Sequence, residues 1–162
     1  MAKKTDNKKG YEGTLAEYKK ARFNFEVLET MEAGIELTGN ETKAVRLGQV
    51  TFDGSHIGVR GNEVFLIGAH ISPYQPSQSK DSKAELDPDR SRKLLLRKEQ
   101  IIQLADAEAV GRQTIVPLAF LARGRYIKLV VGIVRGKKQA DKRQTLKRRD
   151  DKREMDRTLK FQ

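Results

Sequence analysis

Residues 29–48 read Glu29-Thr-Met-Glu-Ala-Gly-Ile-Glu-Leu-Thr-Gly-Asn-Glu-Thr-Lys-Ala-Val-Arg-Leu-Gly48, and the local signals for secondary structure are strongest in this stretch. Apolar side chains at Phe23, Phe25 and Val27 alternate with polar ones, which predicts a strand that runs up to it. Gly34 and Gly39 are expected to interrupt the extended chain.

A short helix is predicted to follow, from Glu41 to Leu47, with Asn40 as its N-cap and Gly48 as its stop. Its apolar positions can face a core while its charged positions stay outside. Strand, turn and helix are therefore expected to form the centre of a compact fold whose charges lie on the rim.

Further strands are predicted on both sides of a basic, polar segment. Residues 54–60 and 63–71 are apolar runs separated by Gly61-Asn62, a composition that favours a tight antiparallel hairpin. Residues 113–118 and 126–134 are rich in Val, Ile and Leu, with Pro117 expected at an edge or a bulge and Gly132 at a bend. The spacing predicts a mainly β fold, a small closed antiparallel barrel with two or three short helices.

Between these strand pairs, residues 73–92 are mostly polar and predict a long exposed loop. A helix is predicted over residues 98–107, with Ile101, Ile102, Leu104 and Ala105 toward an open end of the barrel. Two of the three residues Leu94–Leu96 are expected in the core and the third partly exposed. The neighbouring cations Arg90, Arg92 and Lys93 suit either a solvated rim or a grip on phosphate.

Charge indicates the class of partner. The chain has 33 Lys or Arg against 22 Asp or Glu, a net charge of +11, which indicates a polyanion and mainly nucleic acid. An anionic membrane surface is the competing partner, although no apolar run approaches the roughly 18 residues of a spanning helix. The absence of cysteine excludes disulfides, cysteine-ligated zinc and a thiol nucleophile, and fits a cytoplasmic protein.

The two ends differ from the middle in composition. Residues 1–20 predict a flexible basic arm, residues 21–135 the barrel, and residues 136–162 a basic tail with 11 Lys or Arg against five Asp or Glu. Opposite charges at helical spacing, such as Asp150 and Glu154 near Arg153 and Arg157, predict a tail that is disordered when free and becomes helical on a partner.

Catalytic motifs are sparse, so binding without catalysis or a cofactor is the favoured interpretation. His56 and His70 lie in predicted strands outside any local zinc-binding pattern, and no phosphate-binding glycine loop is present. One alternative is a metal-dependent nuclease that uses carboxylates clustered in the sequence, Glu29, Glu32, Glu36 and Glu41. The other is a general structured-RNA-binding or ribosome-associated basic protein, which the charge supports equally.

The chain also resembles a known family through motifs that stand in one order from residue 20 to about residue 157. These motifs are Lys20-Ala-Arg22, Glu32-Ala-Gly-Ile35, Leu37-Thr-Gly39 with Glu41 and Lys43, Arg46, Pro73-Tyr74, Arg92-Lys-Leu-Leu-Leu96, Val116-Pro-Leu118, Gly136-Lys-Lys138 and Asp141-Lys-Arg143. Their order resembles that of small protein B, the SsrA-binding or tmRNA-binding family of bacterial trans-translation.

The resemblance implies an oligonucleotide-binding (OB) fold with extra helices, and a function without bond chemistry. Members bind the tRNA-like domain of tmRNA, replace its missing anticodon arm and deliver alanyl-tmRNA to stalled ribosomes. The tail then enters the empty mRNA channel near the 16S rRNA of the decoding centre. A monomer, one per tmRNA, is expected.

The resemblance also implies roles for particular residues. Glu32 and Leu95 match RNA-facing positions of the family, and basic residues are expected around them: Lys43, Arg46, Arg90, Arg92 and Lys93. The tail residues expected to meet the ribosome are Gly136, Lys137, Lys138, Asp141, Lys142 and Arg143. Several positions depart from the family pattern. Phe23 replaces a common histidine, Ala44 replaces a frequent serine, Ala140 replaces an aromatic residue or histidine, and Tyr18 stands where some members have a polar RNA-contacting residue.

Overall fold

A computed structural model describes residues 13–74 and 87–160. Its helices and strands are, in chain order, β1 (Thr14–Glu17), α1 (Lys19–Asn24), β2 (Phe25–Ile35), α2 (Gly39–Arg46), β3 (Val50–Thr51), β4 (His56–Arg60), β5 (Glu63–Ile67), β6 (His70–Ile71), β7 (Arg92–Leu95), α3 (Lys98–Ala109), β8 (Gln113–Arg123), β9 (Tyr126–Gly136) and α4 (Gln139–Lys160).

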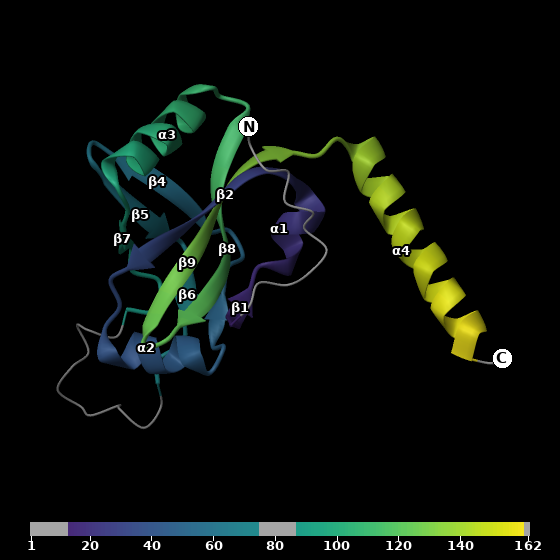
Figure 1. Ribbon diagram of the computed structural model, residues 1–162, viewed down its shortest axis with the longest axis horizontal. Coiled ribbons are helices and arrows are strands. Elements are labelled where there is room, and N and C mark those ends of the chain that lie inside the picture. The colour runs from purple at the N-terminus through teal and green to yellow at the C-terminus, as the bar shows by residue number, and fades with distance from the viewer. Residues whose placement is uncertain (1–12, 75–86, 161–162) are drawn as a thin grey trace.

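The described strands form a curled antiparallel sheet and a small ribbon. Seven strands pair in the order β1-β8-β9-β2-β7-β5-β4, and β3 pairs with β6. The mainly β prediction is confirmed. A closed barrel is not found among the described residues, because β1 and β4 remain at the two edges of the hydrogen-bonded sheet. β4 packs against β8 without a ladder between them. In Figure 1, α3 lies at one end of the sheet and α4 projects away from it.

The central strands β8 and β9 bury both faces, which explains their almost continuous apolar sequence. On one face, Phe120 of β8 belongs to a core cluster with Leu66 of β5 and Leu104 of α3. On the other face, Leu121 of β8 belongs to a second cluster with Ala21 of α1. The two long strands therefore form the rigid centre of the molecule.

Two residues in these strands have local roles close to those predicted. The β8–β9 register shifts between Pro117 and Ala119, so the predicted bulge is confirmed. Gly132 lies within β9, where a Cβ atom would come within 2.6 Å of Leu118 Cδ1. Close packing therefore explains the glycine, in place of the predicted bend at a barrel corner.

Several other predictions for the sheet and helices hold. The hairpin β4–β5 turns at Gly61-Asn62, and α3 forms where a helix was predicted. The core face of α3 was partly misassigned, since Ile102 is 61% exposed while Leu104 is buried. Of the three leucines expected to place two side chains in the core, Leu94 is buried, Leu96 is partly buried against the core and Leu95 is exposed, so that prediction is met in part.

Residues 23–48 fold differently from the prediction at three points. β2 continues through Gly34, and Phe23 belongs to α1 rather than to the strand. The N-cap of α2 is Thr38, not Asn40, because Thr38 and Glu41 form a capping box. Gly48 follows the helix with a φ of 72°, as expected for a residue that ends a helix.

The predicted N-terminal arm and the predicted long loop are only partly covered by the described residues, and each has a different boundary in the structure. Residues 14–17 form β1 and residue 19 begins α1, so the arm predicted over residues 1–20 ends earlier; residues 1–12 are not described. Most of the loop predicted over residues 73–92 also lies outside the described residues, and its last position, Arg92, begins β7.

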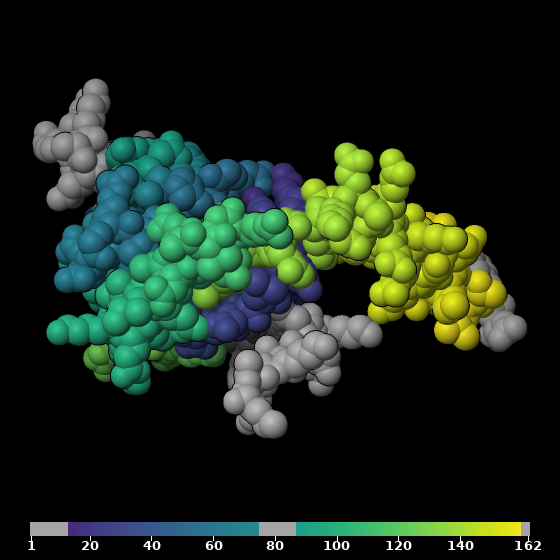
Figure 2. Space-filling model, turned by 90° about the horizontal axis from the view of Figure 1, so that it is seen from above, coloured from purple at the N-terminus to yellow at the C-terminus, as the bar shows by residue number. Residues whose placement is uncertain are grey.

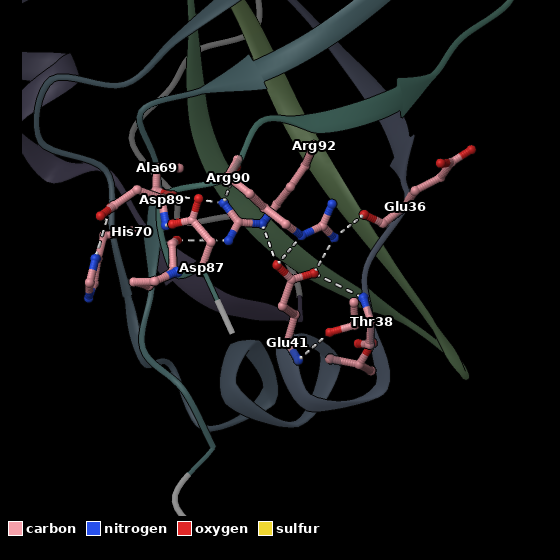
Figure 3. Close-up of polar contacts among 11 residues, drawn as sticks. Glu36, Thr38, Glu41, Ala69, His70, Asp87, Asp89, Arg90 and Arg92 are labelled. Carbon is pink, nitrogen blue, oxygen red and sulfur yellow. Dashed lines mark hydrogen bonds and ion pairs between the residues drawn. The ribbon is translucent and has the colours of Figure 1, made fainter. Parts of the chain in front are cut away.

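An ionic cluster joins α2 to β7 and to the residue two positions before it (Figure 3); its members Glu41 and Arg92 are buried, and Arg90 is partly exposed. Both oxygens of Glu41 accept hydrogen bonds from Arg90, at 2.8 and 2.6 Å, and Arg92 Nε donates to Glu41 Oε1 at 2.9 Å. The backbone N–H of Thr38 donates to the same carboxylate at 2.9 Å. We call Glu41, Arg90 and Arg92 the Glu41 cluster.

Glu41 is ionised at neutral pH in this setting. Burial opposes its charge, but hydrogen bonds from Arg90 and Thr38 and the charge of Arg92 together hold the pKa of Glu41 below its usual value. Its contribution to stability is therefore complete above the unfolded-state pKa and is lost as the pH falls through the lower folded-state pKa.

We predict that Glu41→Gln lowers the free energy of unfolding by about 3–5 kcal/mol at neutral pH, because it leaves the buried Arg92 without its counter-charge. The difference from wild type should shrink as the pH falls below the ordinary range of a glutamate. Urea unfolding between pH 7 and pH 3 measures it, with the exposed Glu36→Gln as a control. If the difference in unfolding free energy between Glu41→Gln and wild type stays constant across this pH range, Glu41 is not the ionised partner of Arg92.

Candidate nucleic-acid interface

An open groove of about 1000 Å³ lies where β2 and β7 separate. The two strands pair at Gly34 with Leu95 and at Ile35 with Leu94, and the backbone N–H of Glu36 also donates to the carbonyl of Lys93. Among the described residues, the part of β2 before Gly34 has no strand paired to it on this side. The groove is lined by Thr30, Met31, Glu32, Gly34, Asn62, Glu63, Lys93, Leu94, Leu95, Leu96, Arg97, Gln100, Ile101 and Lys128. It thus brings together three of the predicted RNA-facing residues: Glu32, Lys93 and Leu95.

Leu95 has the character of an apolar contact surface. Side chains alternate along β7, so Arg92 and Leu94 point inward while Lys93 and Leu95 point outward. Leu95 is 52% exposed. A Cβ atom on Gly34 would lie 3.1 Å from Leu95 Cβ, so the glycine allows β7 to approach β2 here.

Glu32 supplies a fixed negative charge to this groove. Arg123 Nη2 donates to Glu32 Oε1 at 2.6 Å, and this hydrogen bond is the main reason that the pKa of Glu32 lies below its usual value. Partial burial opposes the shift, while the charges of Arg123 and Lys128 add to it. Glu32 is therefore an ionised acceptor that is still partly open to solvent.

The groove also carries positive charge from separate strands. Lys93 pairs with Glu63, and that hydrogen bond raises the pKa of Lys93, so the amine stays protonated. Lys128 comes from β9 and Arg97 from the residue before α3. An acceptor, an apolar surface and cations together suit a ligand that presents phosphates, hydroxyls and bases.

Four other predicted RNA contacts lie outside the groove. Arg92 is fully buried and donates to the carbonyls of Ala69 and Pro88 as well as to Glu41 (Figure 3), so its assignment as an RNA contact is wrong. Arg90 is largely committed to Glu41. The cation of Lys43 lies 5.3 Å from the ring centre of Tyr74.

Arg46 holds a neighbouring loop. Its Nη2 donates to the carbonyl of Arg125 at 2.9 Å, in the turn between β8 and β9. The side chain is exposed, so this contact does not remove it from solvent.

The basic tail forms α4 and projects from the body (Figure 2). Its side chains are mostly exposed, and Arg149 lies over the ring of Phe23 at 5.7 Å. Among the described residues, the helix contacts the body mainly through α1. Disorder of this segment in the free protein stays a prediction.

Not all predicted tail contacts are equally accessible. Gly136 pairs with Phe25 at the end of the sheet. Lys137 Nζ donates to the carbonyl of Arg22 at 2.9 Å, which anchors the start of the tail to α1. Lys138, Asp141 and Arg143 are exposed, and Lys142 is partly exposed.

The carboxylates considered for a nuclease face different partners. Glu32 pairs with Arg123, Glu41 with the two arginines of its cluster, and Glu29 with Gln103. Within residues 13–74 and 87–160, no group of three or more such side chains could hold a metal ion. In the same ranges, no helix is both long and apolar enough to cross a membrane.

The sequence interpretation missed three cations near Glu32: Arg97, Arg123 and Lys128. Lys128 is the one charged residue in the apolar strand predicted over residues 126–134, and this could have indicated an exposed functional position. Arg123 could not be linked to Glu32 from the sequence, because 91 positions separate them and only the β8–β9–β2 register brings them together.

The curled sheet and its mixed polar, basic and apolar groove have the chemistry expected of a basic nucleic-acid-binding protein. Comparisons with known proteins give the family. The model of the SmpB protein family matches residues 15–161, and the chain belongs to this family.

Individual relatives agree over nearly the whole chain. The SsrA-binding protein of Oenococcus oeni is 45% identical and that of Chloroflexus aurantiacus is 44% identical, with 99% and 96% of this chain covered and 98% and 96% of those proteins. A solved chain from "tmRNA-SmpB: a journey to the center of the bacterial ribosome" is 41% identical, with a TM-score of 0.63 over 76% of this chain and 84% of that one.

The Glu41 cluster gives a test that separates buried from groove-facing cations. We predict that Arg92→Met lowers the free energy of unfolding by about 3–5 kcal/mol, because Glu41 loses a buried partner. Lys93→Met, one position along β7, should leave the unfolding midpoint close to that of the wild-type protein. Urea denaturation compares the two variants, and equal midpoints would contradict this division of roles.

Proposed function

We propose that this protein binds the tRNA-like domain of tmRNA and delivers alanyl-tmRNA to stalled ribosomes in trans-translation. The family and its relatives, named SsrA-binding proteins, support this function. So does likeness to a chain from a tmRNA-SmpB structure on the ribosome. The single structural observation that carries the proposal is the groove, which joins Glu32 and Leu95 with cations from β7 and β9.

The groove chemistry suits a folded RNA. Ionised Glu32 accepts hydrogen bonds from a ribose hydroxyl or a base edge, and so orients the RNA in a way that cations alone cannot. Lys93 and Lys128 neutralise phosphate, and Leu95 presents an apolar surface to an unstacked base. Binding replaces the missing anticodon arm of the tRNA-like domain and requires no bond chemistry.

The tail carries the second part of the proposed function. Lys138, Lys142 and Arg143 neutralise phosphates of 16S rRNA as the tail enters the empty mRNA channel near the decoding centre. Asp141 lies among them in the first turn of α4. Ala140 offers no ring for stacking there, so these cations must supply most of the contact. The protein acts as a monomer in the cytoplasm, where the ribosomes are.

A general binder of structured RNA is the alternative function, and Glu32 separates the two. We predict that Glu32→Ala weakens binding of the tRNA-like domain by about 10- to 100-fold, the worth of one or two charge-assisted hydrogen bonds. A binder that uses charge alone would bind as tightly or more tightly, because Arg123 loses its counter-charge. A filter-binding titration at fixed salt measures the effect.

Glu26→Ala is the matched control for this experiment. Glu26 is also an exposed β2 carboxylate paired with an arginine, Arg135, at 2.7 Å, but it lies outside the groove. Glu26→Ala should bind the RNA like wild type. Unchanged affinity of Glu32→Ala would overturn the proposed role of Glu32.

The tail is tested by replacing both Lys142 and Arg143 with Ala. We expect this variant to keep its affinity for the tRNA-like domain and to lose peptide tagging of stalled ribosomes, because the groove is intact while contact with 16S rRNA is reduced. Replacement of Lys152 and Arg153, later in the same helix, controls for loss of charge. Normal tagging by the Lys142/Arg143 variant would show that these residues are not the decoding-centre contact.

A further inference from the structure

Tyr126 is an exposed aromatic residue at the end of the β8–β9 hairpin. Its side chain is 68% exposed, whereas Phe52 and Phe120 are buried and stack on each other in the core. Tyr126 pairs with Arg123 across the two-residue turn Gly124-Arg125. Exposure of this size means that core packing does not explain the aromatic ring.

The strand register places this ring beside the groove. Alternation along β9 puts Tyr126 and Lys128 on one face, while Ile127 between them is buried. Arg123, the cross-strand partner of Tyr126, reaches Glu32, and Lys128 lines the groove with Glu32. The outward face of the hairpin therefore continues the groove toward Tyr126.

The end of the hairpin is held in place by α2. Arg46 donates to the carbonyl of Arg125, the residue directly before Tyr126. Gly124, with a φ of 61°, allows the tight turn. The backbone that presents the ring is thus fixed before any ligand binds, which lowers the entropy cost of binding.

We propose that Tyr126 is a stacking platform for one unpaired base of the RNA held in the groove. This inference rests on the proposed function and adds a base contact to it. RNA loops present unstacked bases, and such bases stack on aromatic rings. Lys128 lies on the same face of β9 as Tyr126, and Arg123 is the cross-strand partner of Tyr126, so the hairpin supplies positive charge for the phosphates that flank that base.

The test measures binding of the tRNA-like domain of tmRNA to full-length variants over a range of salt concentrations. Tyr126→Ala should weaken binding by about 10- to 100-fold, as expected for a lost base–aromatic stack. Tyr126→Phe keeps the ring and should bind within about twofold of wild type. The salt dependence should not change for Tyr126→Ala, whereas Lys128→Ala should reduce its slope by about one phosphate contact.

A scan of the RNA gives a second measurement that does not depend on folding of a variant. Single abasic substitutions are made at each unpaired loop nucleotide and are bound to wild-type protein. At one nucleotide, the abasic substitution should weaken binding to wild-type protein as much as Tyr126→Ala does. The same RNA should bind Tyr126→Ala protein with little further loss of affinity. If no such position exists, or if Tyr126→Phe binds as weakly as Tyr126→Ala, stacking is overturned.

The outcomes separate this inference from the proposed function. Tight binding by wild type with unchanged affinity of Tyr126→Ala would overturn only the stacking role. Failure of the wild-type protein to bind the tRNA-like domain would overturn the proposed function, and the role of Tyr126 with it.

Discussion

The shared carboxylate of Glu41 is the interaction on which the arrangement of the groove depends. One side chain completes the capping box of α2 and accepts hydrogen bonds from Arg90 and Arg92 at the start of β7. Arg92 also ties down the carbonyls of Ala69 and Pro88, so the buried charge is satisfied on several sides. A helix start, a strand start and the segment before β7 are thereby fixed together.

The fixed start of β7 determines which side chains face the groove. Because side chains alternate along a strand, an inward Arg92 requires an outward Lys93 and an outward Leu95. A shift of one residue would bury the lysine and expose the arginine. The buried cluster therefore sets the register of the surface that we propose binds RNA, although none of its members lines that surface.

The positive charge of the chain thus has several different uses. Arg92 stabilises the interior, Lys137 anchors the tail to α1, and Arg46 holds the β8–β9 turn. Lys93 and Lys128 lie in the groove. Net charge alone indicates a polyanionic partner, but burial and hydrogen bonding decide which cations can reach it.

Local features of the fold could be predicted from the sequence. Gly61-Asn62 specified its hairpin, Pro117 its bulge and Gly48 the end of α2, because each depends on backbone geometry near one residue. The cap of α2 was misplaced, because Thr38 has the Glu three residues later that a capping box needs and Asn40 does not. Gly34 does not interrupt the strand, contrary to the prediction; its lack of a side chain allows close packing against Leu95.

Longer-range features could not be predicted in the same way. Closure of the sheet depends on whether its two edge strands meet, and no local pattern reports that. The burial of Arg92 depends on Glu41, 51 positions away, and the partner of Glu32 is further still. The family resemblance supplied Glu32 and Leu95, which the structure places in one groove; Arg123 and Tyr126 came only from strand register.

Competition binding tests the central claim that the groove recognises a folded RNA by more than charge. Labelled tRNA-like domain of tmRNA is bound to the full-length protein at near-physiological salt and challenged with excess elongator tRNA. We predict that the complex persists, because Glu32 and Leu95 add contacts that phosphate neutralisation does not supply. Displacement by elongator tRNA at equal concentration, with binding of both RNAs lost on a modest rise in salt, would contradict it.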